Sequence, residues 1–235
     1  MKKEALILFS GGKDSFLSTL LMLEKGYNVN LVTFDNGYEL KPKNVLIGAR
    51  RIQKKYGIDK VKIIGIKKID AIWRELIYNF YNYDVSYIKK HFGNITFSQF
   101  NCLSCRLSMY ILSIIICKQK KINVVVDGAR KSQLFAIEQD KMIDEFRNLF
   151  KKFNLEILFP LLNENNDYKI KNTILAYGFV PKMHESQCLL GMPIGNSMND
   201  DILNGCFNVY LKELYPKINN ILENYKNVEF DEEYL

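Results

Sequence analysis

Short apolar runs alternate with amphipathic stretches along most of the chain. Residues 4–9 are almost entirely apolar and are followed by two glycines, which predicts a buried strand that ends in a turn. Leucines recur with a helical period in residues 14–26. The further expected strands are 28–34, 60–66, 123–127 and 156–159, and the further expected helices are 44–56, 69–81, 83–91, 101–120, 141–152, 166–177 and 208–225. This alternation is typical of an open, mostly parallel α/β sheet with helices on both faces.

No stretch of the chain has the composition of a linker between two domains. The length of 235 residues fits one large domain. We therefore expect a single domain over residues 1–235, with the α/β core in about 1–160 and a helical C-terminal extension in about 161–235. Within that extension, residues 178–206 are rich in glycine and proline and are expected to form a long loop, which is usually functional or disordered.

The composition is that of an ordinary globular protein. Hydrophobic residues make up 48% and charged residues 25%, which excludes collagen-like and wholly disordered chains. The longest strongly apolar run, residues 110–117, is far shorter than the roughly 20 residues that span a bilayer, and Gly11 and Gly12 interrupt the N-terminal run too early for a signal peptide. The expected location is the cytoplasm.

The net charge of +7 is compatible with an RNA or nucleotide partner, and equally with a cationic solvated surface.

The segment Ser10-Gly11-Gly12-Lys13-Asp14-Ser15 lies between the first expected strand and the first expected helix. Two glycines allow the backbone to approach a ligand closely, and a helix N-terminus favours an anion such as phosphate. Ser10 and Ser15 add hydroxyl donors and Lys13 adds charge. Asp14 is poorly suited to contact phosphate, so we expect it to cap the helix or to act through Mg²⁺. The alternative is a chance turn before a capped helix.

This segment is neither a Walker A loop nor a Gly-x-Gly-x-x-Gly loop. It resembles, at every specified position, the Ser-Gly-Gly-x-Asp-Ser signature of the PP-loop ATP pyrophosphatase superfamily, which is adenine nucleotide α-hydrolase-like in fold. The resemblance implies that ATP is cleaved between its α- and β-phosphates with Mg²⁺. It also implies that a carbonyl oxygen of the acceptor is adenylated, that pyrophosphate is released, and that a nucleophile then displaces AMP. Asp14 is the loop residue for which the resemblance implies a catalytic role.

Two further segments are expected beside the nucleotide. Residues 33–36 end the second strand, where enzymes of this superfamily hold the adenosine; the alternative is a strand that simply ends in an Asx turn. Residues 127–133 follow the fourth strand, at the edge where open α/β sheets bind ligands, and the alternative there is a solvated surface turn. The expected nucleotide-binding residues of these two segments are Phe34, Asp35, Gly128, Arg130, Lys131 and Ser132.

The five cysteines are too few for a disulfide scaffold and divide into three groups. Cys102 and Cys105 are one helical turn apart and share a helix face, as in a redox pair, half of a zinc site or two ligands of an iron–sulfur cluster. Cys188 lies in the long loop. Cys117 lies in an apolar helix and is expected to be a buried core residue. Cys206 is expected at a loop-to-helix boundary, as a structural residue or a fourth ligand.

The set Cys102, Cys105 and Cys188 resembles that of PP-loop sulfurtransferases that hold a [4Fe–4S] cluster with a Cys-x-x-Cys pair and one distant cysteine. The resemblance implies that the three cysteines are catalytic and that the open iron binds the attacking sulfur. Three alternatives stay open: persulfide and disulfide chemistry, a zinc site that includes Cys206, and unliganded thiols. His184, four residues before Cys188, is expected to orient this site or to be a solvated loop residue.

Together these features predict an ATP-dependent sulfurtransferase. The expected acceptor is a base in tRNA or a small molecule, with a separate sulfur donor and a possible homodimer. Two alternatives belong to other classes of protein. One is a PP-loop ligase that forms an amide, in which the cysteines are structural. The other is a sensor that binds an adenine nucleotide without turning it over.

Overall fold

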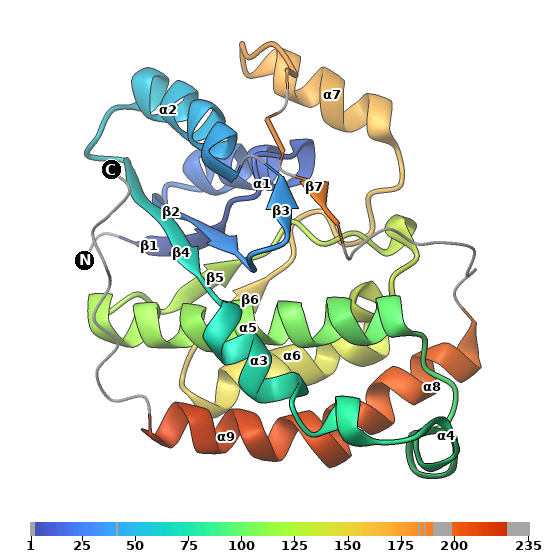
Figure 1. Ribbon diagram of the computed structural model, residues 1–235. Helices are drawn as coiled ribbons and strands as arrows, with labels where there is room; N and C mark the ends of the chain where they lie inside the picture. Colours follow the sequence, from blue (N-terminus) through green and yellow to red (C-terminus); the bar gives the residue numbers. More distant parts are fainter. Residues whose placement is uncertain (1–2, 41, 183, 186, 190–198, 225–235) are drawn as a thin grey trace.

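The computed structural model describes residues 3–40, 42–182, 184–185, 187–189 and 199–224. Five parallel strands form the central sheet within these residues: β1 (Glu4–Leu8), β2 (Asn28–Asp35), β4 (Val61–Lys68), β5 (Val124–Val126) and β6 (Glu156–Leu158). Their order across the sheet is β4-β2-β1-β5-β6 (Figure 1). The predicted open, parallel α/β fold is confirmed.

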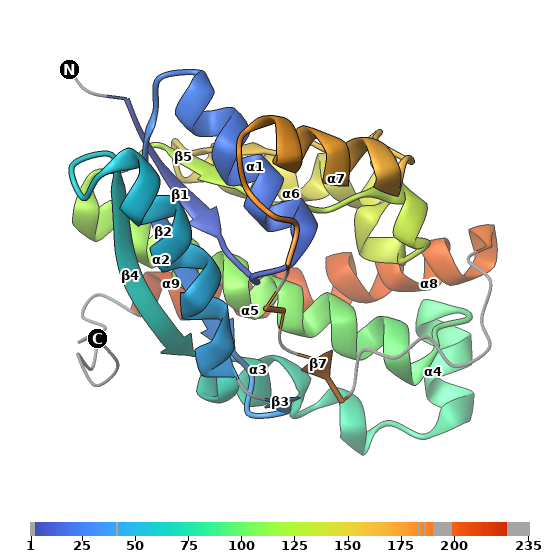
Figure 2. The same cartoon turned by 90° about the horizontal axis from the view of Figure 1, so that it is seen from above.

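Side chains of β1 point alternately to the two faces of the sheet, and each face has its own layer of helices. Ala5 and Ile7 pack on one face, while Leu6 and Leu8 pack on the other. The first face is covered by α1 (Lys13–Glu24), α2 (Val45–Tyr56) and α7 (Asp167–Ala176), which overlie the sheet in Figure 2. The second is covered by α3 (Asp70–Ile77), α5 (Phe97–Lys120) and α6 (Asp140–Lys152). An outer layer of α4 (Val85–Phe92), α8 (Asp200–Val209) and α9 (Tyr215–Asn224) lies beyond them.

The long helix α5 lies at the centre of the second layer. By length and composition it could cross a membrane, but 78% of its most apolar window is buried inside the protein. Its apolar character therefore has a structural reason: α5 packs against α3, α8, α9 and the sheet. The helix begins at Phe97, four residues earlier than predicted, because the Thr96 hydroxyl accepts a hydrogen bond from the Gln99 amide at 3.2 Å. The two cysteines of the Cys-x-x-Cys pair thus lie inside the helix rather than at its start.

The C-terminal helices also begin earlier than the hydrophobic pattern indicates. Asn199 caps α8 by accepting a hydrogen bond from the Ile202 amide at 2.9 Å, so residues 200–206 are helical and not part of a loop. A π-helical segment, Tyr210–Leu214, joins α8 to α9 just before Pro216. In a regular α-helix the ring of Pro216 would clash with the carbonyl group four residues earlier. Cys206 therefore lies within α8, and its expected place at a loop-to-helix boundary is wrong. Residues 190–198 of the predicted loop lie outside the described residues.

A two-stranded antiparallel ribbon stands apart from the main sheet. It pairs β3 (Glu39–Leu40) with β7 (Gln187–Cys188), and the Leu189 amide continues the ladder by donating to the Tyr38 carbonyl at 3.0 Å. Strands of two residues have no readable period, so the sequence did not predict this ribbon. It brings Cys188 close to the end of β2.

Chain order places a ligand crevice at the middle of the sheet. The chain adds β2 and β4 on one side of β1 and then β5 and β6 on the other. The connections that leave β1 and β5 consequently diverge to opposite sides, which opens a crevice at the carboxyl ends of these two strands. The segment 10–15 follows β1 and the segment 127–133 follows β5, so the two predicted nucleotide-binding segments meet there.

Candidate active site

The segment 10–15 forms a compact loop at the N-terminus of α1. Gly11 has a φ of 76°, a conformation that favours glycine, and Gly12 is the N-cap residue without a side-chain cap on the helix. The Ser15 hydroxyl donates to the Gly12 carbonyl at 3.1 Å and accepts from the Ser10 amide at 3.2 Å. The two serine hydroxyls thus shape the loop. The uncapped helix N-terminus is the part that suits an anion.

Gly128 holds the end of β5 against this loop. A Cβ atom at residue 128 would lie 2.9 Å from the Ser15 backbone nitrogen and 3.0 Å from the Asp14 carbonyl carbon. Backbone atoms cannot yield as a flexible side chain does, so only glycine fits here. Gly128, predicted as a nucleotide-binding residue, thus packs closely against the first turn of α1.

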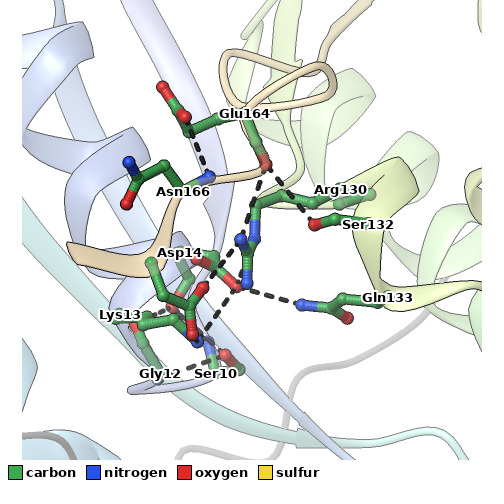
Figure 3. Close-up of polar contacts among 12 residues, drawn as sticks. Ser10, Gly12, Lys13, Asp14, Arg130, Ser132, Gln133, Glu164 and Asn166 are labelled. Carbon is green, nitrogen blue, oxygen red and sulfur yellow. Dashed lines mark hydrogen bonds and ion pairs between the residues drawn. The ribbon is translucent and has the colours of Figure 1, made fainter. Parts of the chain in front are cut away.

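Asp14 lies at the centre of a cluster of charges beside the loop (Figure 3). Its Oδ2 is 3.0 Å from Arg130 Nε and accepts a hydrogen bond from Gln133 Nε2 at 3.0 Å. Arg130, which is 4% exposed, also pairs with Asp167 at 2.9 Å. Burial raises the pKa of Asp14, and the charges of Lys13 and Arg130 oppose that rise. Asp14 is in the first turn of α1 and is not its capping residue, so the capping role expected for it is wrong.

The other residues predicted at the nucleotide have different surroundings. Phe34 lines the cavity described below, whereas the Asp35 carboxylate accepts from the Gly37 amide at 2.8 Å in an Asx turn. Lys131 pairs with Asp140 at 2.6 Å, and the Ser132 hydroxyl donates to the Glu164 carbonyl at 3.4 Å. Among the described residues, four of those predicted at the nucleotide near the ends of β2 and β5 do not line the cavity, and their role at the nucleotide stays a prediction: Asp35, Arg130, Lys131 and Ser132.

A cavity of about 270 Å³ opens at the carboxyl ends of β1, β2 and β5. Ser10, Asp14 and Ser15 line one part of it, and Gly128 lines another. Cys188 lines the same cavity. One chamber therefore joins the phosphate loop to a candidate sulfur-handling residue.

A buried group of polar side chains that the sequence analysis did not identify forms part of the cavity wall. Arg106 pairs with Asp127, whose Oδ2 also accepts a hydrogen bond from the Tyr110 hydroxyl at 2.7 Å. Glu138 lines the cavity at 2% exposure, and burial raises its pKa to about 7, with the Arg106 charge opposing and the Asp127 charge adding to the shift. The sequence offered one clue to this group, which is that Arg106 directly follows Cys105. Glu138 belongs to a short turn without periodicity.

Two of the five cysteines, Cys105 and Cys188, meet at Asn36 near the end of β2. The Asn36 side-chain nitrogen donates to Cys105 Sγ at 3.4 Å and to Cys188 Sγ at 3.7 Å. Cys102 lies one helical turn before Cys105 on α5, and the charge of a Cys188 thiolate would raise the pKa of both. Burial is the larger cause: it raises the pKa of Cys102 to about 11 and that of Cys105 to about 12. The structure thus brings Cys105 and Cys188 together at the Asn36 side chain, and Cys102 lies one helical turn before Cys105.

The remaining two cysteines lie in the core. Cys117 is 1% exposed and Cys206 is fully buried. Burial raises the pKa of each thiol to about 12. Both are packed among the apolar side chains of the second helix layer, as small core residues are.

The thiols of Cys102, Cys105 and Cys188 fit a thiophilic metal group by the chemistry of their donors. Thiolates select iron–sulfur clusters, zinc and copper(I) over hard cations. Among the described residues, no three histidine, cysteine or acidic side chains already stand at metal-binding spacing. Cys102, Cys105 and Cys188 would hold such a group. For a hard cation near the loop, Asp14 Oδ1 is a suitable ligand, since it is buried and has no hydrogen-bond partner in the described part of the chain.

The segment that carries Cys188 crosses the phosphate loop. Arg51 donates to the carbonyls of Lys182 and Val180 at 2.9 and 2.6 Å, and the His184 amide donates to the Gly11 carbonyl at 3.2 Å. His184 is therefore anchored to the loop through its backbone. The Glu185 carboxylate lies so close to Gly12 that a Cβ there would be 2.6 Å from its Oε1.

Glu185 was not identified from the sequence. Burial raises the pKa of its carboxyl group, the negative charge of Asp14 raises it further, and Lys13 opposes the shift. An anionic ligand on the loop and the Glu185 carboxylate would repel each other, since both carry negative charge beside Gly12. No spacing or motif marks this residue.

Fold and site together define a PP-loop ATP pyrophosphatase, as the sequence resemblance implied. The family described as thiamine biosynthesis protein (ThiI) matches residues 1–190. Since this match spans most of the chain, the protein belongs to the ThiI family. No curated protein matches the sequence.

Solved structures are similar to this chain at low sequence identity. A 4-thiouridine synthetase in complex with RNA and bound ATP is 15% identical with a TM-score of 0.59, over 94% of this chain and 54% of that one. NMN synthetase from Francisella tularensis is 11% identical with a TM-score of 0.51, over 99% of this chain and 90% of that one. The U34-tRNA thiolase NcsA from Methanococcus maripaludis, with its [4Fe–4S] cluster, is 16% identical with a TM-score of 0.49, over 97% of this chain and 73% of that one. This chain spans about half the length of the 4-thiouridine synthetase.

Proposed function

We propose that this protein is an ATP-dependent sulfurtransferase that replaces a carbonyl oxygen of a base in tRNA with sulfur. The observation that carries the proposal is the shared cavity: Cys188 lines the same chamber as Ser10 and Asp14, and Asn36 links Cys188 to Cys105. A phosphate loop alone serves many reactions. A phosphate loop that opens onto gathered thiols suits reactions in which sulfur displaces AMP.

The proposed reaction has two steps. The carbonyl oxygen of the base attacks the α-phosphorus of ATP, the bond to the β-phosphate oxygen breaks, and pyrophosphate leaves. Sulfur at the oxidation level of sulfide then attacks the carbon, and the carbon–oxygen bond breaks as AMP departs with that oxygen. No net oxidation occurs, so the reaction needs a sulfur donor but no separate oxidant.

Residues of the loop serve the first step. The uncapped N-terminus of α1 binds the leaving pyrophosphate, and Asp14 would hold Mg²⁺ through Oδ1, which has no hydrogen-bond partner in the described part of the chain. Arg130 then exchanges its pairing with Asp14 and Asp167 for contact with phosphate oxygens, which a guanidinium group can bind in a bidentate manner. Phe34 borders the chamber where the adenosine is expected.

The three thiols serve the second step. Cys102, Cys105 and Cys188 would hold a [4Fe–4S] cluster, whose iron would supply a thiophilic site for the incoming sulfur. Metal binding is compatible with the raised pKa values of Cys102 and Cys105, because coordination deprotonates a thiol that burial would otherwise keep neutral. Persulfide chemistry on the same thiols is the rival mechanism, and it requires no iron.

The test uses anaerobically reconstituted full-length protein with ATP, Mg²⁺, sulfide and unmodified tRNA transcripts. We expect AMP and pyrophosphate in equal amounts, together with one thionucleoside in the digested tRNA. ADP and inorganic phosphate as products would contradict the proposal. Product formation that depends on ammonium instead of sulfide would establish the amide-forming ligase, and ATP binding without any AMP would establish the sensor.

A further inference from the structure

Asn36 is a buried polar residue directly after β2, with 3% of its surface exposed. Its side-chain oxygen accepts a hydrogen bond from the Tyr38 amide at 2.9 Å. An amide nitrogen cannot accept a hydrogen bond, so this contact establishes which end of the side chain is oxygen. The other end, Nδ2, therefore presents its two hydrogens to the sulfur atoms of Cys105 and Cys188 at 3.4 and 3.7 Å.

This single amide connects two parts of the chain that are far apart in sequence. Cys105 lies on α5 and Cys188 on the two-residue strand β7. In the described part of the chain, Asn36 is the side chain that donates a hydrogen bond to either sulfur. Burial raises the pKa of Cys105, and the hydrogen bond from Asn36 acts against that rise, since it stabilises negative charge on the sulfur.

We propose that Asn36 is a positioning residue of the thiol site, where its amide holds the sulfur atoms of Cys105 and Cys188 beside each other. This inference rests on the proposed function, in which these two cysteines act together. It also assigns Asn36 to the thiols of Cys105 and Cys188 rather than to the nucleotide, where residues 33–36 were expected. Asn36 keeps this role whether the thiols hold a cluster or exchange a persulfide.

The first test measures disulfide formation in metal-free, reduced protein. Diamide oxidises the Cys105 and Cys188 thiols, taking two electrons and two protons and becoming the hydrazine, and a disulfide forms between them. A Cys102→Ala background keeps the neighbouring thiol from competing. The rate is followed by quenching with N-ethylmaleimide and mapping peptides by mass spectrometry without reduction.

Two substitutions of a buried asparagine by aspartate distinguish a positioning role of Asn36 from the general effect of a buried charge on the disulfide rate. Asn36→Asp keeps an oxygen for the Tyr38 amide but removes the donor to both sulfurs, so we expect a rate about tenfold lower. Asn101→Asp is the matched control: Asn101 is 2% exposed, its oxygen accepts from the Tyr81 hydroxyl, and its Nδ2 has no partner among the described residues. We expect the Asn101→Asp rate to match that of the parent. Equal rates in all three proteins would overturn the inference.

Asn36→Leu adds a variant without a buried charge, in case Asn36→Asp fails to fold. It should also form the disulfide about tenfold more slowly, and a parental rate would contradict the proposal. The second readout is the reduction potential of the reconstituted cluster, which should become more negative in Asn36→Leu because hydrogen bonds to sulfur raise it. An unchanged potential would contradict the inference. If the unsubstituted protein binds no iron, the cluster part of the proposed function fails, while the disulfide rates still decide the role of Asn36.

Discussion

The phosphate loop and the thiol site lie at the same edge of the sheet but are built in opposite ways. The loop is a contiguous run of six residues, and its serine hydroxyls bond to the loop's own backbone. The thiol site combines α5, the end of β2 and the ribbon strand β7, which Asn36 joins. A local motif thus forms the first site, whereas the second exists only once distant segments have packed together.

The two regions also differ in electrostatics. Around the loop, Arg130 and Lys13 stand among Asp14 and Asp167, so opposite charges compensate each other. At the thiols, burial is the dominant influence and raises the pKa values of Cys102 and Cys105. We therefore expect the loop region to exchange one charged partner for another when an anion binds. The thiols become charged only when a metal or another cation compensates for their burial.

The largest expected effect is a loss of sulfur transfer at the thiol site that leaves the ATP-dependent step at the loop intact. Cys188→Ala should lower sulfur transfer at least about 1,000-fold, because it removes a reacting group, while acceptor-dependent release of pyrophosphate continues, since that release precedes the attack of sulfur. Thionucleoside analysis and pyrophosphate assays on the same samples measure both activities. Cys117→Ala, a substitution in the apolar core, is the control and should retain sulfur transfer. Loss of both activities in Cys188→Ala would show that the loop depends on the thiol site.

A substitution on the loop side should have the converse effect. Gly128→Ala places a methyl group 2.9 Å from the Ser15 nitrogen and must displace the first turn of α1. We expect kcat/KM for ATP to fall about 100-fold, since small misplacements of binding groups have effects of that size. Pyrophosphate release at varied ATP concentration measures it.

Gly48→Ala is the matched control for this change. Its Cβ would meet the Phe9 ring at 3.4 Å, an ordinary contact, inside helix α2. Activity should be unchanged, and stability should stay the same or rise by about 0.5–1 kcal/mol. A Gly128→Ala protein with the ATP kinetics of Gly48→Ala would show that the loop tolerates displacement.

Glu138, in the cavity wall, should make the free energy of unfolding depend on pH. Burial raises the pKa of Glu138 from 4.5 to about 7, so between these values the folded protein holds a proton that the unfolded chain has lost. The free energy of unfolding should therefore fall as pH rises from 4.5 to 7, by at most about 3 kcal/mol. Denaturant titrations across this range measure the slope.

Glu138→Gln should flatten this dependence, because it removes the titrating group. Glu75→Gln, which removes an exposed carboxyl on α3, should leave it as in the unsubstituted protein. A Glu138→Gln protein that keeps the full slope would assign the effect to another group.

The smallest effect is expected at the cysteine that neighbours the thiol site without belonging to it. The charge of Cys102 adds to the rise of the Cys206 pKa, yet Cys206 is fully buried within α8. Cys206→Ala should retain all iron and lose about 1 kcal/mol of stability, because it leaves a small cavity. Metal analysis and thermal melting measure the two quantities. Loss of zinc from a protein that holds no sulfide would instead indicate a closed structural site.

Regular elements with a clear period could be read from the sequence. The strand at residues 4–8 and the helix that follows it were predicted within a residue or two, because an apolar run and a leucine stripe are local signals. Helix starts were missed where a polar cap decides them: Thr96 begins α5 and Asn199 begins α8, each before the apolar pattern becomes visible. The ribbon of β3 and β7 was missed because it depends on pairing between distant segments.

By itself, the sequence determined the α/β fold and the phosphate loop of this protein, since hydrophobic period and a contiguous motif act within a few residues. It also singled out Cys102, Cys105 and Cys188. Only the tertiary structure decided that Asn36 joins two of these thiols, that Glu138 is buried in the cavity wall and that Glu185 lies against Gly12. These three residues have no local signal, because what defines each is a neighbour that chain packing brings from far along the sequence.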